Sequence, residues 1–200
     1  TIITGRGTLK FAVTSRTAIT CTGDVDIQGD IVLDGTDISN ELIRATGSRF
    51  IMSVREVKNI FQNSVEGVRP ILVANVDHIR IFGTTFKRIA TPTNGVTGDA
   101  QGACQGIVIN GSCKSGKIYN CRFEDINNRS EAGGTLQYAD ADAVLCAVSS
   151  QTQNFSVFDC EFENIGKRFF KATGTPTSVY RFSNNNNMSS AYTGTSDTVG

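Results

Sequence analysis

Three copies of one segment, at residues 71–89, 107–126 and 144–165, limit the folds that this chain can adopt. When the copies are laid over one another, Ile, Val, Phe and Cys residues fall into shared columns. Every copy has a Phe three positions before its final Ile. Apolar and polar residues alternate within each copy with a period of two, which is typical of short strands joined by tight turns. A repeat of such units predicts a solenoid in which each copy forms one coil.

The shared columns predict how the coils stack. The columns are Ile71, Ile107 and Val144; Val73, Ile109 and Cys146; Ile81, Ile118 and Val157; Thr84, Cys121 and Cys160; Phe86, Phe123 and Phe162; Ile89, Ile126 and Ile165; and a column of turn formers, Gly83, Asn120 and Asp159. A single coil cannot bury its own apolar face, so each column should lie on itself in neighbouring coils, with strands about 4.8 Å apart. The interior is therefore expected to consist of ladders of like side chains.

Two short runs carry a resemblance to a known family. The runs I-Y-N-C-R-F-E-D-I (residues 118–126) and V-F-D-C-E-F-E-N-I (residues 157–165) resemble the coils of the pectate-lyase-like superfamily. The resemblance implies an all-β fold, a right-handed single-stranded parallel β-helix, with long loops at one corner. We expect this β-helix to span residues 1–188, with irregular first coils over residues 1–47, and residues 189–200 to form a loosely ordered tail.

The coils outside the three copies match less well. In residues 50–65 we place Val57 in the Ile81 column, which leaves Gln62 where the other coils have Phe. In the last coil we place Val179 in the Val157 column and Asn184 in the Phe column. Residues 184–187 then form either an asparagine ladder or the end of the regular coils.

Two of the coils carry insertions, at residues 90–106 and 127–143. Both insertions leave the coil at the same corner, so they should stack side by side over the strands that begin at Ile107 and Val144. Loops of this length are uncommon in compact domains unless they have a function. The alternative is neutral drift, because the entropy cost of closing a loop rises slowly with its length.

The second insertion ends in A-D-A-D-A-V-L-C (residues 139–146). Within it, Asp142-Ala143-Val144 is similar to the second half of the D-D-[AC]-[IV] motif that holds a catalytic carboxylate in β-helical hydrolases of the polygalacturonase type. The resemblance implies that Asp142 and its neighbour Asp140 are catalytic. Asp140 departs from the motif by one position, and the N-T-D, G-H-G and R-I-K elements of that family have no match in the chain.

Glycoside hydrolysis needs two carboxyl groups, about 5 Å apart for a retaining mechanism and about 6.5–9.5 Å apart for an inverting one. Neighbouring coils supply roughly the first spacing, so Asp99 in the preceding insertion is the expected catalytic partner, with Glu131 in reserve. Tyr138, Arg129 and Glu131 are the expected substrate-binding residues, and Tyr138 would stack on a sugar ring. The alternative is that Asp140 and Asp142 only cap a turn through their own backbone.

Composition excludes several other functions. Lys plus Arg and Asp plus Glu both number 19, which argues against a nucleic-acid binder, since such proteins need a basic excess. No apolar run reaches the roughly 18 residues of a membrane span, so we expect no membrane insertion. His78 is the only histidine, and no Cys/His spacing suggests zinc; we expect no metal site and no cofactor. The six cysteines are expected to be buried free thiols that act as small hydrophobic residues.

The resemblance to the pectate-lyase-like superfamily implies, by analogy, a carbohydrate-binding β-helix of a bacteriophage tailspike or a similar extracellular protein, located on the virion tail or outside the cell. Its expected partner is a host surface polysaccharide, its expected assembly a homotrimer, and its favoured enzyme class a glycoside hydrolase that degrades this polysaccharide. The alternatives are a non-catalytic structural or adhesive shaft, a secreted pectinase-like hydrolase and a calcium-dependent lyase.

Overall fold

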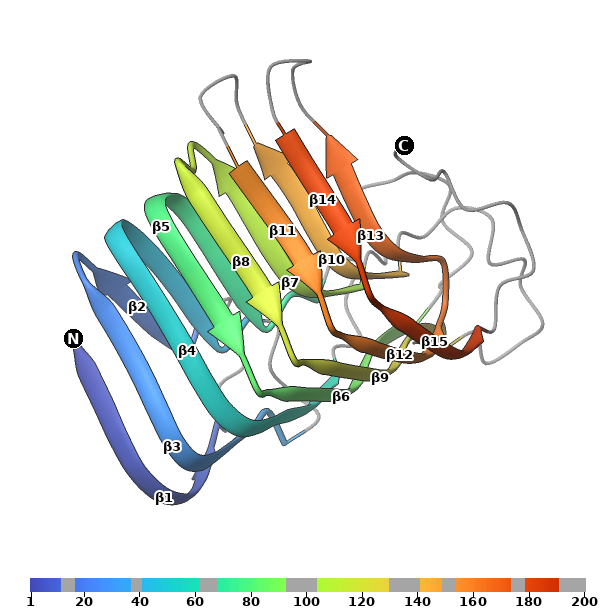
Figure 1. The fold of residues 1–200 in the computed structure, drawn as a ribbon. Coiled ribbons are helices and arrows are strands. Elements are labelled where there is room, and N and C mark those ends of the chain that lie inside the picture. Colours follow the sequence, from blue (N-terminus) through green and yellow to red (C-terminus); the bar gives the residue numbers. More distant parts are fainter. Residues whose placement is uncertain are drawn as a thin grey trace.

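The computed structural model describes residues 1–11, 17–36, 41–61, 68–92, 104–129, 141–148, 154–173 and 179–190. Within these residues the chain forms fifteen strands of one continuous sheet that coils on itself (Figure 1). In chain order the strands are β1 (Ile2–Lys10), β2 (Ile19–Thr22), β3 (Val25–Asp34), β4 (Ile43–Phe61), β5 (Ile71–Phe82), β6 (Thr85–Pro92), β7 (Cys104–Gly111), β8 (Ser115–Tyr119), β9 (Arg122–Arg129), β10 (Ala141–Val148), β11 (Asn154–Phe158), β12 (Glu161–Ile165), β13 (Arg168–Thr173), β14 (Val179–Ser183) and β15 (Asn186–Ser190).

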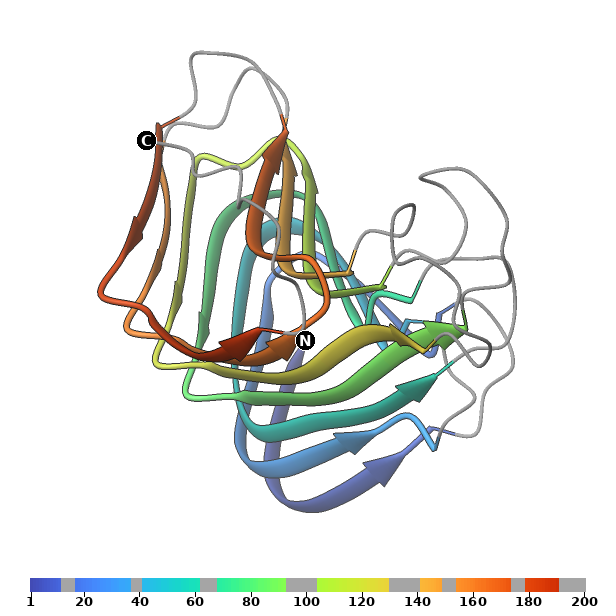
Figure 2. The ribbon, with the colours of Figure 1, turned by 90° about the vertical axis from the view of Figure 1, so that its right-hand side faces the viewer.

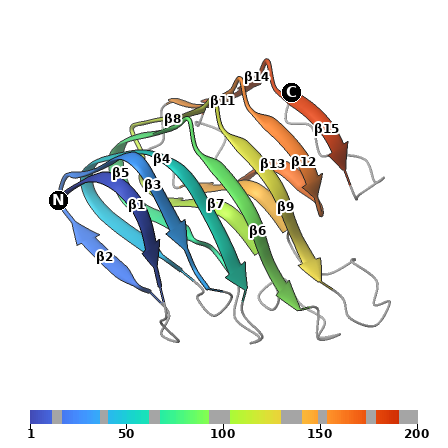
Figure 3. The same ribbon diagram turned by 90° about the horizontal axis from the view of Figure 1, so that it is seen from below.

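Successive coils lie behind one another, and each contributes a stretch of strand to three faces (Figure 2). The first face contains β2, the starts of β4 and β5, then β7, β10 and β13. The second contains the middle of β4, the end of β5, then β8, β11 and β14. The third contains the ends of β1, β3 and β4, then β6, β9, β12 and β15 (Figure 3). Every strand pair is parallel, which confirms the predicted all-β parallel β-helix.

The interior confirms the predicted ladders. Phe86 pairs with Phe123 and Phe123 with Phe162 across neighbouring strands, and all three side chains are fully buried. Their rings stack with centroids 4.9 and 5.3 Å apart and planes inclined by 7° and 6°. The columns that contain Ile71, Ile81 and Ile89 are likewise in register and buried. Burial of large apolar side chains in successive coils is the main source of stability in such a stack.

The predicted turn column is also confirmed and has a conformational reason. Gly83, Asn120 and Asp159 have φ values of 60°, 52° and 53°. This left-handed conformation costs most residues about 1–2 kcal/mol, and Gly, Asn and Asp tolerate it best. A second left-handed column, made up of Asn59, Arg88, Asp125 and Asn164, precedes the final Ile of successive coils with φ values of 53–56°. The sequence did not predict this second column, because Arg88 occupies one of its positions and Arg is not a typical turn former.

The predicted register is wrong in two coils. Val57 pairs with Phe86, and Met52 occupies the Ile81 column, so the placement of Val57 in the Ile81 column is incorrect; Gln62 lies outside the described residues. In the last coil, Phe182 pairs with Val157, whereas Val179 pairs with Asn154. Asn184 has a φ of 53° and continues the turn column instead of the Phe column.

The ends of the stack follow the same pairing. β1 pairs with β3 over nine consecutive residue pairs, whereas the pairing of β3 with β4 shifts in register between Gly29 and Val32. The predicted start of the tail at residue 189 falls within β15, and residues 191–200 lie outside the described residues. None of the described residues forms a helix of the length and apolarity that crossing a membrane requires.

All six cysteines are free and buried, as predicted. The Cys104 thiol donates a hydrogen bond of 2.9 Å to the Ile89 carbonyl. Burial raises the pKa of the Cys113 thiol to about 12 and raises the pKa of the Cys104 thiol further above its ordinary value. These thiols are therefore protonated at neutral pH and act as small apolar residues of the core.

Candidate functional site

The long-loop corner lies where the third face leads into the first. β6 and β9 pair up to Pro92 and Arg129, and β7 and β10 pair from Cys104 and Ala141 onward. Both insertions therefore leave and re-enter at the same corner, as predicted. Strands occupy the ends of both predicted insertions, which leaves residues 93–103 and 130–140 between strands; these lie outside the described residues.

Most of the predicted site residues fall in those two segments. Asp99, Glu131, Tyr138 and Asp140 lie outside the described residues, and only the backbone of Arg129, the last residue of β9, is described. Asp142, the second residue of β10, is the one predicted site residue whose side chain is described. The spacing of the predicted carboxylate pair is therefore still a prediction.

The Asp142 carboxylate is completely buried and held by Arg168, the first residue of β13. Arg168 donates from Nε to Oδ1 at 2.7 Å and from Nη2 to Oδ2 at 3.3 Å, while 16% of its own side chain is exposed. The two residues are neighbours across the strands, and Gln105 is the neighbour of Asp142 on the other side. A bidentate ion pair fixes both carboxylate oxygens. Sequence analysis missed Arg168, because it lies one coil later.

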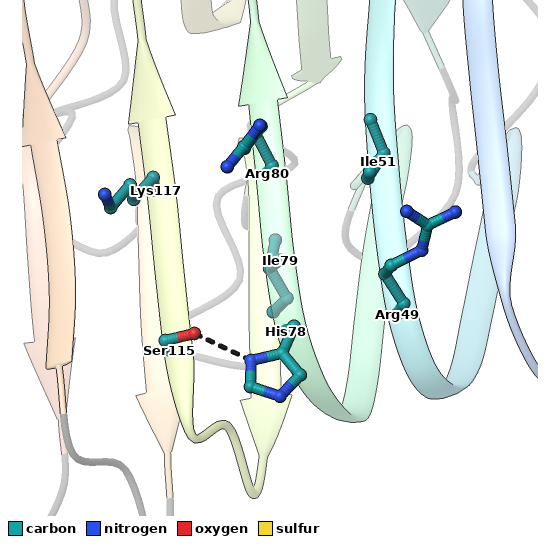
Figure 4. A pocket seen from close by; sticks show the side chains of 7 residues that line it. All are labelled: Arg49, Ile51, His78, Ile79, Arg80, Ser115 and Lys117. Atoms are coloured by element: carbon teal, nitrogen blue, oxygen red, sulfur yellow. Dashed lines mark hydrogen bonds between the residues drawn. The ribbon is translucent and has the colours of Figure 1, made fainter.

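A shallow pocket of about 370 Å³ lies elsewhere, on the outward side of the second face (Figure 4). Side chains alternate along a strand, so the neighbours of inward-facing Phe50 and Ile79 point outward. These neighbours form two rows across β4, β5 and β8: Arg49, His78 and Ser115 in one row, and Ile51, Arg80 and Lys117 in the other. We name this site the Arg80 pocket; its lining residues are Arg49, Ile51, His78, Ile79, Arg80, Ser115 and Lys117.

The core determines the local shape of the pocket. Gly116 separates Ser115 from Lys117, and the Phe155 ring of the next coil lies over its Cα. A Cβ atom at position 116 would lie 2.2 Å from Phe155 Cδ2, a contact that real Cβ atoms do not make. Gly116 thus lets a large ring fill the core beneath the pocket without displacing β8.

The polar groups of the Arg80 pocket differ in how they are paired. His78 Nδ1 and Ser115 Oγ share a hydrogen bond of 2.9 Å (Figure 4). Arg49 makes only long contacts, 3.9 Å to Asp24 and 3.7 Å to Asp26. Arg80 and Lys117 are exposed, and neither has an ion-pair or hydrogen-bond partner among the side chains that the structure describes. These two cationic donors are therefore available to a ligand.

An aromatic ladder borders the second face next to the turn column. Phe82, Tyr119 and Phe158 stack with centroids 5.2 Å apart in both steps and with planes inclined by 6° and 7°. All three side chains are half-buried. Because neighbouring rings cover each other's faces, the ladder stabilises the stack and offers little open ring surface to a sugar.

A second cavity, of about 350 Å³, lies beside the turn column and is lined in part by Arg122, Asp159 and Glu161. Arg122 is already engaged there, since its guanidinium contacts Glu124, Glu161 and Glu163. Among the described residues that line this cavity, none is a cation free of a carboxylate partner. Within the described residues, no group of three His, Cys, Asp or Glu side chains has the arrangement of a metal site.

Of the sites compared above, the Arg80 pocket is therefore the one that offers unpaired hydrogen-bond donors, and strands hold these donors in place. Sites built on strands hold their side chains more firmly than sites on loops. No protein-family model, curated protein or solved structure matches the chain.

Proposed function

We propose that this chain is a carbohydrate-binding parallel β-helix that holds a polysaccharide on the outward side of its second face. The observation that carries the proposal is the composition of the Arg80 pocket. Half-buried Ile51 lies beside the exposed donors of Arg80 and Lys117, with the Ser115 hydroxyl in the neighbouring row. Sugars present C–H faces and hydroxyl edges, and pockets that combine apolar surface with a few placed polar groups suit such ligands.

The shape of the face supports a polymeric ligand over a single small molecule. The two rows of the pocket continue onto β11, where Asn154 neighbours Ser115 and Ser156 neighbours Lys117. Polar side chains therefore extend beyond the pocket along the stack of coils. A chain of sugars that crossed several coils would make many weak contacts, whose effects combine as in other multivalent ligands.

The resemblance of the coil motifs to the pectate-lyase-like superfamily supports the finer part of the proposal. In this view the chain belongs to a bacteriophage tailspike or a similar extracellular protein that binds a host surface polysaccharide, with the homotrimer and the virion location as further predictions. Hydrolysis at the long-loop corner is also still a prediction. Asp142 is engaged by Arg168 there, so the described residues support binding more directly than cleavage.

Filling the Arg80 pocket should weaken polysaccharide binding. We expect Ser115→Phe to reduce affinity about tenfold or more, because the ring occupies the space between His78 and Lys117 without changing the net charge. Affinity electrophoresis against a panel of bacterial capsular and exopolysaccharides measures the effect. Thr20→Phe, at an exposed position of β2 on the first face, is the matched control.

Both variants should retain the circular dichroism of the native chain, since both replaced residues lie on the outer side of a strand. The proposal is wrong if the native chain binds no polysaccharide of the panel. It is also wrong if Ser115→Phe binds the retained polysaccharide as tightly as Thr20→Phe does.

A further inference from the structure

We infer that the Arg80 pocket binds an anionic group of the polysaccharide: a carboxylate, a sulfate ester or a phosphate ester. The inference rests on the proposed function and adds the chemical class of the ligand. The chain has equal numbers of acidic and basic residues, 19 of each. The seven described residues that line the pocket nevertheless include Arg49, Arg80 and Lys117 and no carboxylate. The positive charge of the pocket is therefore a local feature.

Arg80 and Lys117 are direct neighbours on β5 and β8. Neighbouring parallel strands lie about 4.8 Å apart, and like charges that face each other across strands destabilise a sheet. An anion placed between the guanidinium and the ammonium would remove this repulsion. The pair thus has a physical reason to bind a negative group.

Three cations of the third face contact carboxylates of the chain. Lys87 is the strand neighbour of Glu124 and contacts it at 2.6 Å, and Arg122 is the neighbour of Glu161 and contacts it at 3.2 Å. The neighbours Lys58 and Lys87 carry like charges, but Lys58 contacts Glu56 at 2.7 Å. Lys58, Lys87 and Arg122 are therefore paired with carboxylates of the chain, whereas the exposed Arg88 of β6 has no partner among the described residues.

Carboxylates near the Arg80 pocket serve other cations. Lys114 contacts Asp77 at 2.8 Å, and Asp24 and Asp26 flank Arg49. None of these contacts involves Arg80 or Lys117. The row of Arg80 and Lys117 continues through Ser156 to Arg181 on β14, which adds a further exposed cation along the stack.

The two cations suit an oxyanion in complementary ways. The planar guanidinium of Arg80 matches the paired oxygens of a carboxylate, sulfate or phosphate, and the Lys117 ammonium acts as a point charge. Exposed charges bind weakly one at a time. A polymer with regularly spaced anionic groups therefore fits this face better than a single anion does. A nucleic acid fits less well, because a chain with a net charge of zero lacks the basic excess that phosphate backbones require.

The test compares dextran, carboxymethyl dextran, dextran sulfate and dextran phosphate of one chain length at low salt. We expect the native chain to bind at least one of the three anionic dextrans and not neutral dextran. Arg80→Gln/Lys117→Gln should weaken this binding about tenfold. The control is Arg55→Gln/Lys58→Gln, which makes the same change in net charge on β4, outside the pocket. This double variant should bind as tightly as the native chain does. Binding should fall as NaCl is raised, because about 0.1 M salt screens charges beyond about 10 Å.

The inference is overturned if no anionic dextran binds, if dextran binds as tightly as its anionic derivatives, or if both double variants lose affinity equally. It is also overturned if a single-stranded oligonucleotide of equal charge binds as tightly as dextran sulfate, which indicates a nonspecific polyanion surface. If the native chain binds a neutral polysaccharide and Ser115→Phe abolishes this binding, the proposed function stands and only this inference is wrong. The three anionic derivatives identify which oxyanion the pocket prefers.

Discussion

Phe123→Ala is expected to lower the free energy of unfolding by about 3–5 kcal/mol, the range for removing a buried aromatic side chain. The Phe123 ring is fully buried between Phe86 and Phe162. Its loss therefore leaves a cavity between three coils and interrupts the ladder on both sides. Urea unfolding followed by circular dichroism measures the change.

Tyr119→Ala is the matched control for this ladder. Tyr119 stacks between Phe82 and Phe158 with similar geometry, but its side chain is half-buried on the outer side of the second face. We expect a smaller loss of about 1–3 kcal/mol for this variant, because it removes two aromatic pair contacts worth about 0.5–1.5 kcal/mol each. Equal losses for Phe123→Ala and Tyr119→Ala would contradict the view that the inner Phe ladder carries most of the stability.

Asp142→Ala is expected to destabilise the chain by about 3–5 kcal/mol, because it removes one partner of a buried ion pair. Arg168, whose side chain is 16% exposed, would keep its charge without the carboxylate that accepts hydrogen bonds from its Nε and Nη2. Arg55→Gln is the control. It breaks the ion pair between Arg55 and Asp30, which has a similar length of 2.8 Å, but the two side chains are 57% and 41% exposed. That control should cost less than about 1 kcal/mol.

This comparison also bears on the catalytic prediction for Asp142. A loss of polysaccharide cleavage in an Asp142 variant would have to be separated from a loss of folding. If Asp142→Ala unfolds no more readily than Arg55→Gln, the structural role assigned to the carboxylate is wrong. The catalytic role would then regain support.

The fold was predictable from the sequence where three copies could be compared. Period-two alternation alone does not set the register, but the spacing of Phe and Ile in each copy does. In residues 50–65 the alternation is broken, since Phe50, Ile51 and Met52 are consecutive and two polar residues separate Val54 from Val57, and the register prediction failed there. Val57 and Ile60 repeat the three-residue spacing of Phe86 and Ile89, so this spacing could have identified the correct register.

The candidate site was harder to predict, because its residues come from three coils. Arg80 and Lys117 occupy equivalent outward positions in two of the repeat copies, so the overlay already placed them side by side. An outward Lys or Arg is usually only a solvated surface residue. That no described carboxylate contacts Arg80 or Lys117 can be learned only from the folded chain. The same holds for Arg168, whose contact with Asp142 depends on the register of β10 and β13.

The central claim is that a polysaccharide lies on the outward side of the second face. Backbone amide chemical shifts of the isotope-labelled chain, recorded with and without the polysaccharide that it binds, test this claim most directly. We expect the largest changes at residues 78–80 of β5 and 115–117 of β8. Changes confined to the ends of β6 and β9 and the starts of β7 and β10 would contradict the claim, because they would place the ligand at the long-loop corner instead.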